Sequence, residues 1–71
     1  MKLHYYLETD SLYIELKSDP ASETREIVSG LNVDHDENGD VVGFDIDGAS
    51  GRLDLTKLET LALPLRLTTA A

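Results

Sequence analysis

The sequence predicts an α+β fold, an antiparallel β-meander of four to five strands with one C-terminal helix packed on its apolar face. Three observations support this prediction. Apolar and polar residues alternate up to about residue 47, Asn38-Gly39 separates two of the alternating runs, and Leu55, Leu58, Leu61 and Ala62 fall at spacings of three and four. With 71 residues, the chain is expected to form a single small domain, residues 1–71.

The first two alternating runs, residues 2–7 and 12–17, predict an antiparallel hairpin. Each run places an apolar side chain at every second position, which is typical of a half-buried strand. The polar residues 8–11 between them include Asp and Ser, which favour turns. Tyr6 and Tyr13 fall on the opposite face, where they are either surface rings or part of an interface.

The middle of the chain predicts three further strands. Asp19-Pro20 marks a loop, because proline has no backbone N–H to donate to a sheet. Residues 24–28 form a weaker strand candidate, followed by strands at 31–35 and 41–46. Asn38-Gly39 between the last two predicts a type I′ hairpin turn with positive φ at Gly39.

After residue 50 the apolar spacing changes to three and four, which predicts a short helix at about 54–62. Thr56-Lys57-Leu58-Glu59 matches a capping box, Asp54 is an alternative cap, and Pro64 ends the helix. Residues 63–67 alternate again, as an edge strand or as an arm onto a second subunit. The side chains expected to be mostly buried are Leu3, Tyr5, Leu12, Ile14, Leu16, Val33, Phe44, Ile46, Leu58 and Leu61.

Composition and charge exclude several classes of protein. Fourteen acidic and six basic residues give a net charge of −8, which disfavours nucleic-acid binding because phosphates are neutralised by Lys and Arg. The absence of cysteine excludes disulfides and zinc–thiolate sites. The sequence contains no run of about 18 apolar residues and therefore predicts no membrane span. Residues 1–10 lack the apolar core of a secretion signal. We therefore expect a cytoplasmic protein without contacts to membranes.

An acidic stretch between residues 34 and 45 has nearly the ligand spacing of an EF-hand calcium loop. EF-hand loops lie between helices, however, whereas strand-like alternation flanks this stretch on both sides. We favour a plain acidic hairpin, with cation or small-ligand binding as the alternative. The candidate ligands for that alternative are Asp34, Asp36, Asn38, Asp40 and Asp45.

Motifs that indicate catalysis are missing from the sequence. His4 and His35 lie 31 residues apart on separate predicted strands, and neither is next to a recognisable nucleophile. There is no G-x-S-x-G elbow and no glycine-rich phosphate loop. We therefore expect a non-enzymatic protein without catalytic residues and without a cofactor.

The last third of the chain is richer in leucine than one short segment of a small domain usually hides. A homodimer formed through this segment is therefore predicted, and the acidic half of a heteromeric protein pair is the other reading. The leucines concerned are Leu53, Leu55, Leu58, Leu61, Leu63, Leu65 and Leu67.

The sequence also resembles the domain-of-unknown-function family 2283, small bacterial proteins of about this length. The resemblance covers residues 2–50 and is carried by Tyr5, Asp10-x-Leu12-Tyr13-Ile14, Glu23-Thr24-Arg25-Glu26, Asp34-x-Asp36-x-x-Gly39-x-x-x-Gly43-Phe44-Asp45-Ile46 and Ala49-Ser50. The family usually has Glu at the position of Asp45. It has no assigned activity, and some members resemble partners of small toxin-like genes, which implies an antitoxin-type role with a basic toxin as partner.

Overall fold

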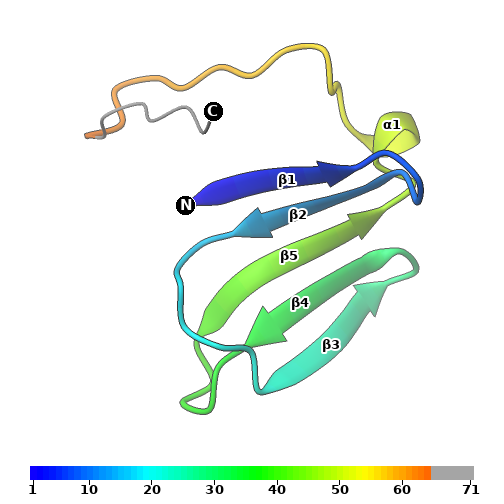
Figure 1. Cartoon of the computed structure of the whole chain (residues 1–71). Coiled ribbons are helices and arrows are strands. Elements are labelled where there is room, and N and C mark those ends of the chain that lie inside the picture. Colours follow the sequence, from blue (N-terminus) through cyan, green and yellow to red (C-terminus); the bar gives the residue numbers. More distant parts are fainter. Residues whose placement is uncertain (65–71) are drawn as a thin grey trace.

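The computed structural model describes residues 1–64, in which five strands form one antiparallel sheet (Figure 1). The strands are β1 (Lys2–Tyr6), β2 (Ser11–Glu15), β3 (Glu23–Val28), β4 (Leu31–His35) and β5 (Val41–Asp47). Every strand lies where the alternating pattern predicts one. In these 64 residues no helix has the length and apolar character needed to cross a membrane.

The strand order, β1-β2-β5-β4-β3, differs from the predicted meander. β1–β2 forms one hairpin and β3–β4–β5 forms a three-stranded meander, and β2 joins the two units by pairing with β5 rather than with β3. The loop that contains Pro20 carries the chain from β2 past the end of β5 to the far edge (Figure 1). This order puts the most apolar strand, β5, in the centre, where both of its edges are hydrogen-bonded.

Strand pairing gives the sheet two chemically different faces. Residues directly opposite each other on paired strands share a face, and the pairs Leu3–Ile14, Ile14–Phe44 and Phe44–Val33 continue one apolar row across four strands. We call this side the apolar face, formed by Leu3, Tyr5, Leu12, Ile14, Leu31, Val33, Phe44 and Ile46. The other side, the polar face, is formed by Lys2, His4, Tyr6, Tyr13, Glu15, Thr24, Glu26, Asn32, Asp34, Asp45 and Asp47.

The predicted C-terminal helix at 54–62 is wrong. The helix in the structure, α1 (Ala49–Arg52), has four residues and lies at the end of the sheet, where the Ala49 N–H donates to the carbonyl of Asp10 at 2.8 Å. Residues 53–64 are irregular and begin with a local turn in which the Asp54 side chain accepts the Thr56 N–H at 3.0 Å. A nine-residue helix is marginal in water without a surface to pack on, so the local turn replaces the expected capping box.

Because no helix within residues 1–64 covers the sheet, burial is lower than the sequence predicts. Of the ten side chains expected in the core, Leu12 and Val33 are buried, whereas Leu3 is 47% and Tyr5 38% exposed. Leu58 and Leu61, expected on the buried face of the helix, are 73% and 82% exposed. The expected edge strand or arm at 63–67 is not a strand at Leu63 and Pro64, and its remaining positions lie outside the described residues.

The turn between β4 and β5 has the predicted position but a different type. Gly39 has φ +85°, as predicted, whereas Asn38 does not have the positive φ that a type I′ turn requires. Instead the Gly39 N–H donates to the Asp36 carbonyl at 3.0 Å, and the Asp36 N–H donates to the Asp40 carbonyl at 2.8 Å. These bonds close a longer loop in which one glycine supplies the left-handed residue.

Candidate protein-interaction surface

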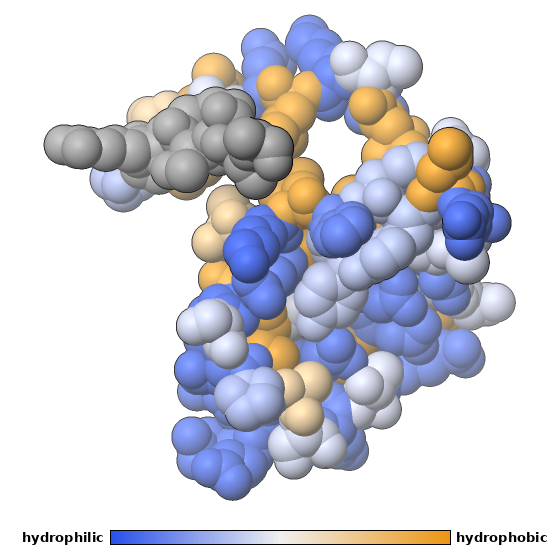
Figure 2. Space-filling model, in the orientation of Figure 1, coloured by the Kyte–Doolittle hydropathy of each residue, from blue (hydrophilic) through white to orange (hydrophobic). Residues whose placement is uncertain are grey.

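The apolar face is the main candidate site, because nothing in the described part of the chain forms a second layer over it. Leu3 and Tyr5, on edge strand β1, are exposed, and Ile14, Phe44 and Ile46 near the middle of the sheet are only half-buried. The viewed side in Figure 2 is mostly hydrophilic over the sheet, and the apolar face lies behind it. A contiguous apolar surface of this kind on a small protein marks a contact site.

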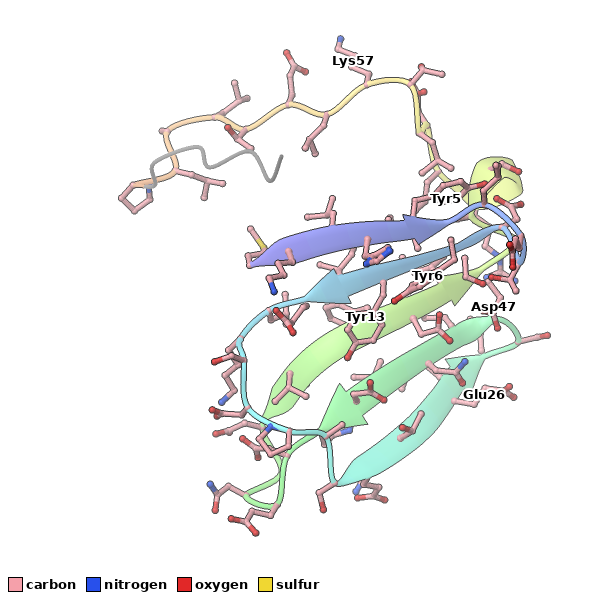
Figure 3. The ribbon with its side chains drawn as sticks, viewed as in Figure 1. Tyr5, Tyr6, Tyr13, Glu26, Asp47 and Lys57 are labelled. Atoms are coloured by element: carbon pink, nitrogen blue, oxygen red, sulfur yellow. The ribbon has the colours of Figure 1, made fainter. Side chains whose placement is uncertain are left out.

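A second apolar surface follows α1. We call residues 53–63 the leucine segment; it runs beyond the β1 edge of the sheet (Figure 1), and open space separates part of it from the sheet (Figure 2). Lys57 points away from the sheet (Figure 3). All five leucines of the segment are exposed, namely Leu53, Leu55, Leu58, Leu61 and Leu63. The chain therefore carries two apolar surfaces that do not cover each other.

Charge is distributed unequally between the two faces of the sheet. The polar face carries five carboxylates, Glu15, Glu26, Asp34, Asp45 and Asp47, with Lys2 as its basic residue. Glu26 and Asp47 are labelled on this side in Figure 3. On the apolar side, Arg25 and Glu23 form an ion pair at 3.1 Å on the outer strand β3. The centre of the apolar face is therefore free of charge within residues 1–64.

A hydrogen-bond network crosses the polar face. The Tyr13 hydroxyl donates to Asp34 Oδ2 at 2.7 Å, and the Thr24 hydroxyl donates to Asp34 Oδ1 at 2.6 Å, so one carboxylate links β2, β4 and β3. Burial, together with the bond to Asp34, raises the pKa of Tyr13 to about 12. Burial, followed by the charge of Asp47, raises the pKa of Asp45. The bonds of Tyr13 and Thr24 to Asp34 link strands of the sheet, and these groups are not arranged around a substrate-sized space.

A second network fastens α1 to the first hairpin. Asp10 has φ +50° in the β1–β2 turn, a conformation that aspartate tolerates. Its carboxylate accepts the hydroxyls of Ser50 and Tyr5 at 2.6 and 2.7 Å and the Ser50 N–H at 3.0 Å. The bond from Ser50, followed by that from Tyr5, lowers the pKa of Asp10. Tyr5 is thereby held with its ring on the apolar face and its hydroxyl at the turn.

The five candidate cation ligands do not converge. Asp34 and Asp45 lie on the polar face, in register with Gly43 and Asn32 respectively, and so are not directly opposed. Asp36 is buried, and its carboxylate accepts the N–H groups of Asn38 and Asp40 at 2.9 and 3.0 Å. Burial raises the pKa of Asp36, but these backbone bonds and Lys17 outweigh burial and lower it.

A lysine ammonium occupies the position that a cation would take at this hairpin. Lys17 Nζ lies 3.3 Å from Asp36, 3.4 Å from Asp19 and 3.6 Å from Asp40. Next to it, a cavity of about 370 Å³ is lined by residues 19–22 and 36–38. Among residues 1–64 no group of three or more His, Cys, Asp or Glu side chains is placed to share a metal ion.

The two histidines lie on opposite sides of the sheet. His4 stacks on Tyr6 of the polar face, with ring centroids 4.2 Å apart and planes inclined by 4°. His35 faces the side of Val33, and its Nδ1 is buried without a hydrogen-bond partner in the described part of the chain. The structure therefore does not bring the two imidazoles together.

Sequence reasoning did not identify Gly43 and Asp10 as residues on which these networks depend. Gly43 lies under the Tyr13 ring, where a Cβ would collide with it, and Asp10 accepts the bonds from Tyr5 and Ser50. A signal was present at Gly43, because a glycine within a strand often marks the close approach of another group. At Asp10 the pattern indicated only a turn, since the contact to Ser50 spans forty residues. Pairing over that distance cannot be read from local spacing.

Comparison of the chain with known proteins identifies one family. No curated protein and no solved structure matches the chain. The sequence model of one family, described as "Protein of unknown function (DUF2283)", matches residues 2–50, which contain all five strands and the residues of both networks. The leucine segment lies outside the matched range. The chain belongs to the DUF2283 family.

Proposed function

We propose that this protein is a non-enzymatic interaction module that binds protein through its apolar face. The observation that carries the proposal is the uncovered apolar side of a single-layered sheet. A second layer normally buries such a surface. In this chain the described residues supply none, so a separate protein surface is the natural second layer.

Two further observations support binding over catalysis or cation capture. The titratable groups Tyr13, Asp10 and Asp36, which have altered pKa values, are bonded to structural partners, and of these three only Asp36 lines the cavity beside Lys17. Lys17 already pairs with Asp36 and Asp40 of the acidic hairpin, which disfavours a further cation there. We therefore propose that the chain has neither catalytic residues nor a bound cofactor, and that it acts in the cytoplasm.

The charge of the polar face favours a basic protein as an additional partner. Five carboxylates on one side of the sheet accelerate the encounter with a positively charged surface. This supports the antitoxin-type role that the family resemblance implies, with a basic toxin bound at the polar side. Such a complex should weaken as salt is raised, because screening shortens the reach of these charges.

Site-specific photo-crosslinking tests the proposed interaction. Leu3 and His4 are neighbours on β1 that lie on opposite faces, so benzoylphenylalanine at position 3 probes the apolar face and the same group at position 4 is the matched control. In cells that make the protein, we expect a protein adduct from position 3 and a different adduct or none from position 4. If position 3 yields no adduct while the variant remains folded, the apolar face is not a binding surface.

A further inference from the structure

We propose that the protein on the apolar face is a second copy of this chain. The two sheets pack with their apolar faces toward each other, and the leucine segment of each chain lies against the sheet of the other. This inference rests on the proposed function, since it names the partner of the same surface. Three properties of the chain support it: its exposed area, its charge distribution and the position of its leucines.

The exposed area is larger than a compact monomer of this mass usually has. The chain exposes 5773 Å², whereas a monomer of 7.8 kDa exposes about 4,400 Å². The one-layered sheet and the leucine segment contribute to this excess of roughly 1,400 Å² per chain. Two copies that each covered this excess would bury about 2,800 Å² in total, within the range of obligate homodimers.

The charge distribution favours the approach of two copies through this face. Residues 1–51 contain twelve acidic and three basic side chains and so carry a net charge of −9, whereas the leucine segment contains two acidic side chains and one basic side chain and carries −1. Face-to-face packing places the carboxylates of both polar faces on the outside. It also brings the near-neutral leucine segments, rather than two acidic surfaces, into contact with the partner. Added salt should therefore strengthen the dimer by screening the remaining repulsion.

The leucines of the segment are placed to contact another chain. Leu58 and Leu61 are the most exposed of them, and the segment lies beyond the β1 edge rather than over its own apolar face (Figure 1). On that edge Leu3 is the exposed residue of the apolar face nearest the start of the chain. In the proposed dimer the two-fold axis lies across the strands, so that β1 of one copy packs over β1 of the other and each leucine segment lies beside this edge of the partner. The pair Leu3 and Leu58 therefore reports on contact between the chains.

Disulfide trapping tests the proposal directly, because the chain has no cysteine and each introduced thiol reacts alone. Leu3→Cys and Leu58→Cys are made separately, mixed, and oxidised with copper phenanthroline. We expect a disulfide-linked species of twice the chain mass that contains both variants. The control mixture of His4→Cys with Leu58→Cys places the thiol one residue away on the polar face and should yield far less of this species.

The mass of the unmodified chain in solution tests the dimer without any substitution that could affect folding. Sedimentation equilibrium at micromolar concentration should give twice 7.8 kDa, with a larger dimer fraction at high salt. A mass of 7.8 kDa at low and high salt overturns the inference, as does a Leu3→Cys/Leu58→Cys double variant that closes an internal disulfide as a monomer. In either case an adduct of another mass from the position 3 photo-crosslinker would leave the proposed interaction module intact with a different partner.

Discussion

Tyr13 on β2 reaches across Gly43 on β5 and donates its hydroxyl to Asp34 on β4, with Tyr13 Oη 2.7 Å from Asp34 Oδ2. The absence of a side chain at position 43 is what makes this possible. A Cβ built on Gly43 would lie 2.6 Å from Tyr13 Cζ, closer than packed atoms approach. The glycine therefore leaves space for a tyrosine that connects the β1–β2 hairpin to the β3–β4–β5 meander.

Replacement of Gly43 by alanine should destabilise the protein because the Tyr13 ring must move and lose its bond to Asp34. We expect a loss on the order of 1–3 kcal/mol, the range for overpacked positions. Urea unfolding followed by circular dichroism measures it. In a Tyr13→Val background the same substitution should cost much less, as in a double-mutant cycle. Equal costs in both backgrounds would show that the ring is not the cause.

Replacement of Gly39 by valine tests the β4–β5 loop. Gly39 has φ +85° and no atom within 4 Å of a built Cβ, so strain in the backbone is the only penalty. A β-branched residue tolerates this φ poorly, and we expect a loss of about 1–2 kcal/mol in the free energy of unfolding. Gly51→Val is the matched control, because its site is equally open and has no positive φ. An unchanged denaturation midpoint for Gly39→Val would contradict the assigned conformation.

The strands were predictable because their information is local. In β2 and β5 an apolar side chain at every second position indicates which side of the sheet is the apolar face. Strand order was not predictable in this way. The pairing of Ile14 with Phe44 joins residues thirty positions apart, and nothing in either run distinguishes that partner from a residue of β3.

The helix prediction failed for a related reason. The spacing of Leu55, Leu58 and Leu61 fits a helix, but such spacing stabilises one only when the leucines pack on a surface. In the structure Leu58 and Leu61 are exposed, so residues 1–64 supply no such surface for them. The candidate site shows the same limit, because alternation predicted an apolar side of the sheet but the sequence does not show whether the chain covers it.

Replacement of Asp45 by asparagine should raise stability at neutral pH. Burial, followed by the charges of Asp47 and Asp34, raises the pKa of Asp45 in the folded protein. A raised carboxyl pKa means that the ionised form is less favourable in the folded than in the unfolded state, so this group opposes folding at pH values above its folded pKa. The amide of asparagine removes that charge, and its oxygen can still accept from Asn32.

The pH dependence of the Asp45→Asn variant distinguishes this cause from a general effect. The stability gain over the parent protein should be largest near pH 7 and should shrink as pH falls through the Asp45 pKa, where the parent carboxyl also becomes neutral. Glu26→Gln, on the exposed edge of the same face, is the control for loss of one negative charge. A gain of the same size at pH 3 and pH 7 would exclude the titration of Asp45 as its origin.

Replacement of Asp10 by asparagine should weaken the attachment of α1 and reduce the acid sensitivity of the fold. The bonds from Ser50 and then Tyr5 lower the pKa of Asp10. A lowered carboxyl pKa contributes stability that is present above the unfolded-state pKa, about 3.9, and is lost as pH falls through the folded pKa. The variant should therefore be less stable than the parent at pH 7, because the charge-assisted bonds to Asp10 are weakened. This deficit should shrink toward pH 2.

The control for Asp10 is Glu8→Gln in the same turn, since the Glu8 side chain is exposed and makes no hydrogen bond to residues 1–64. Urea midpoints of the three proteins between pH 7 and pH 2 measure the difference, and hydrogen exchange at the Ser50 N–H reports on α1 directly. That amide donates to Asp10 Oδ1, so it should exchange faster in Asp10→Asn at pH 7 and unchanged in Glu8→Gln. If the Ser50 amide stays equally protected in Asp10→Asn, the carboxylate of Asp10 does not hold α1 to the first hairpin.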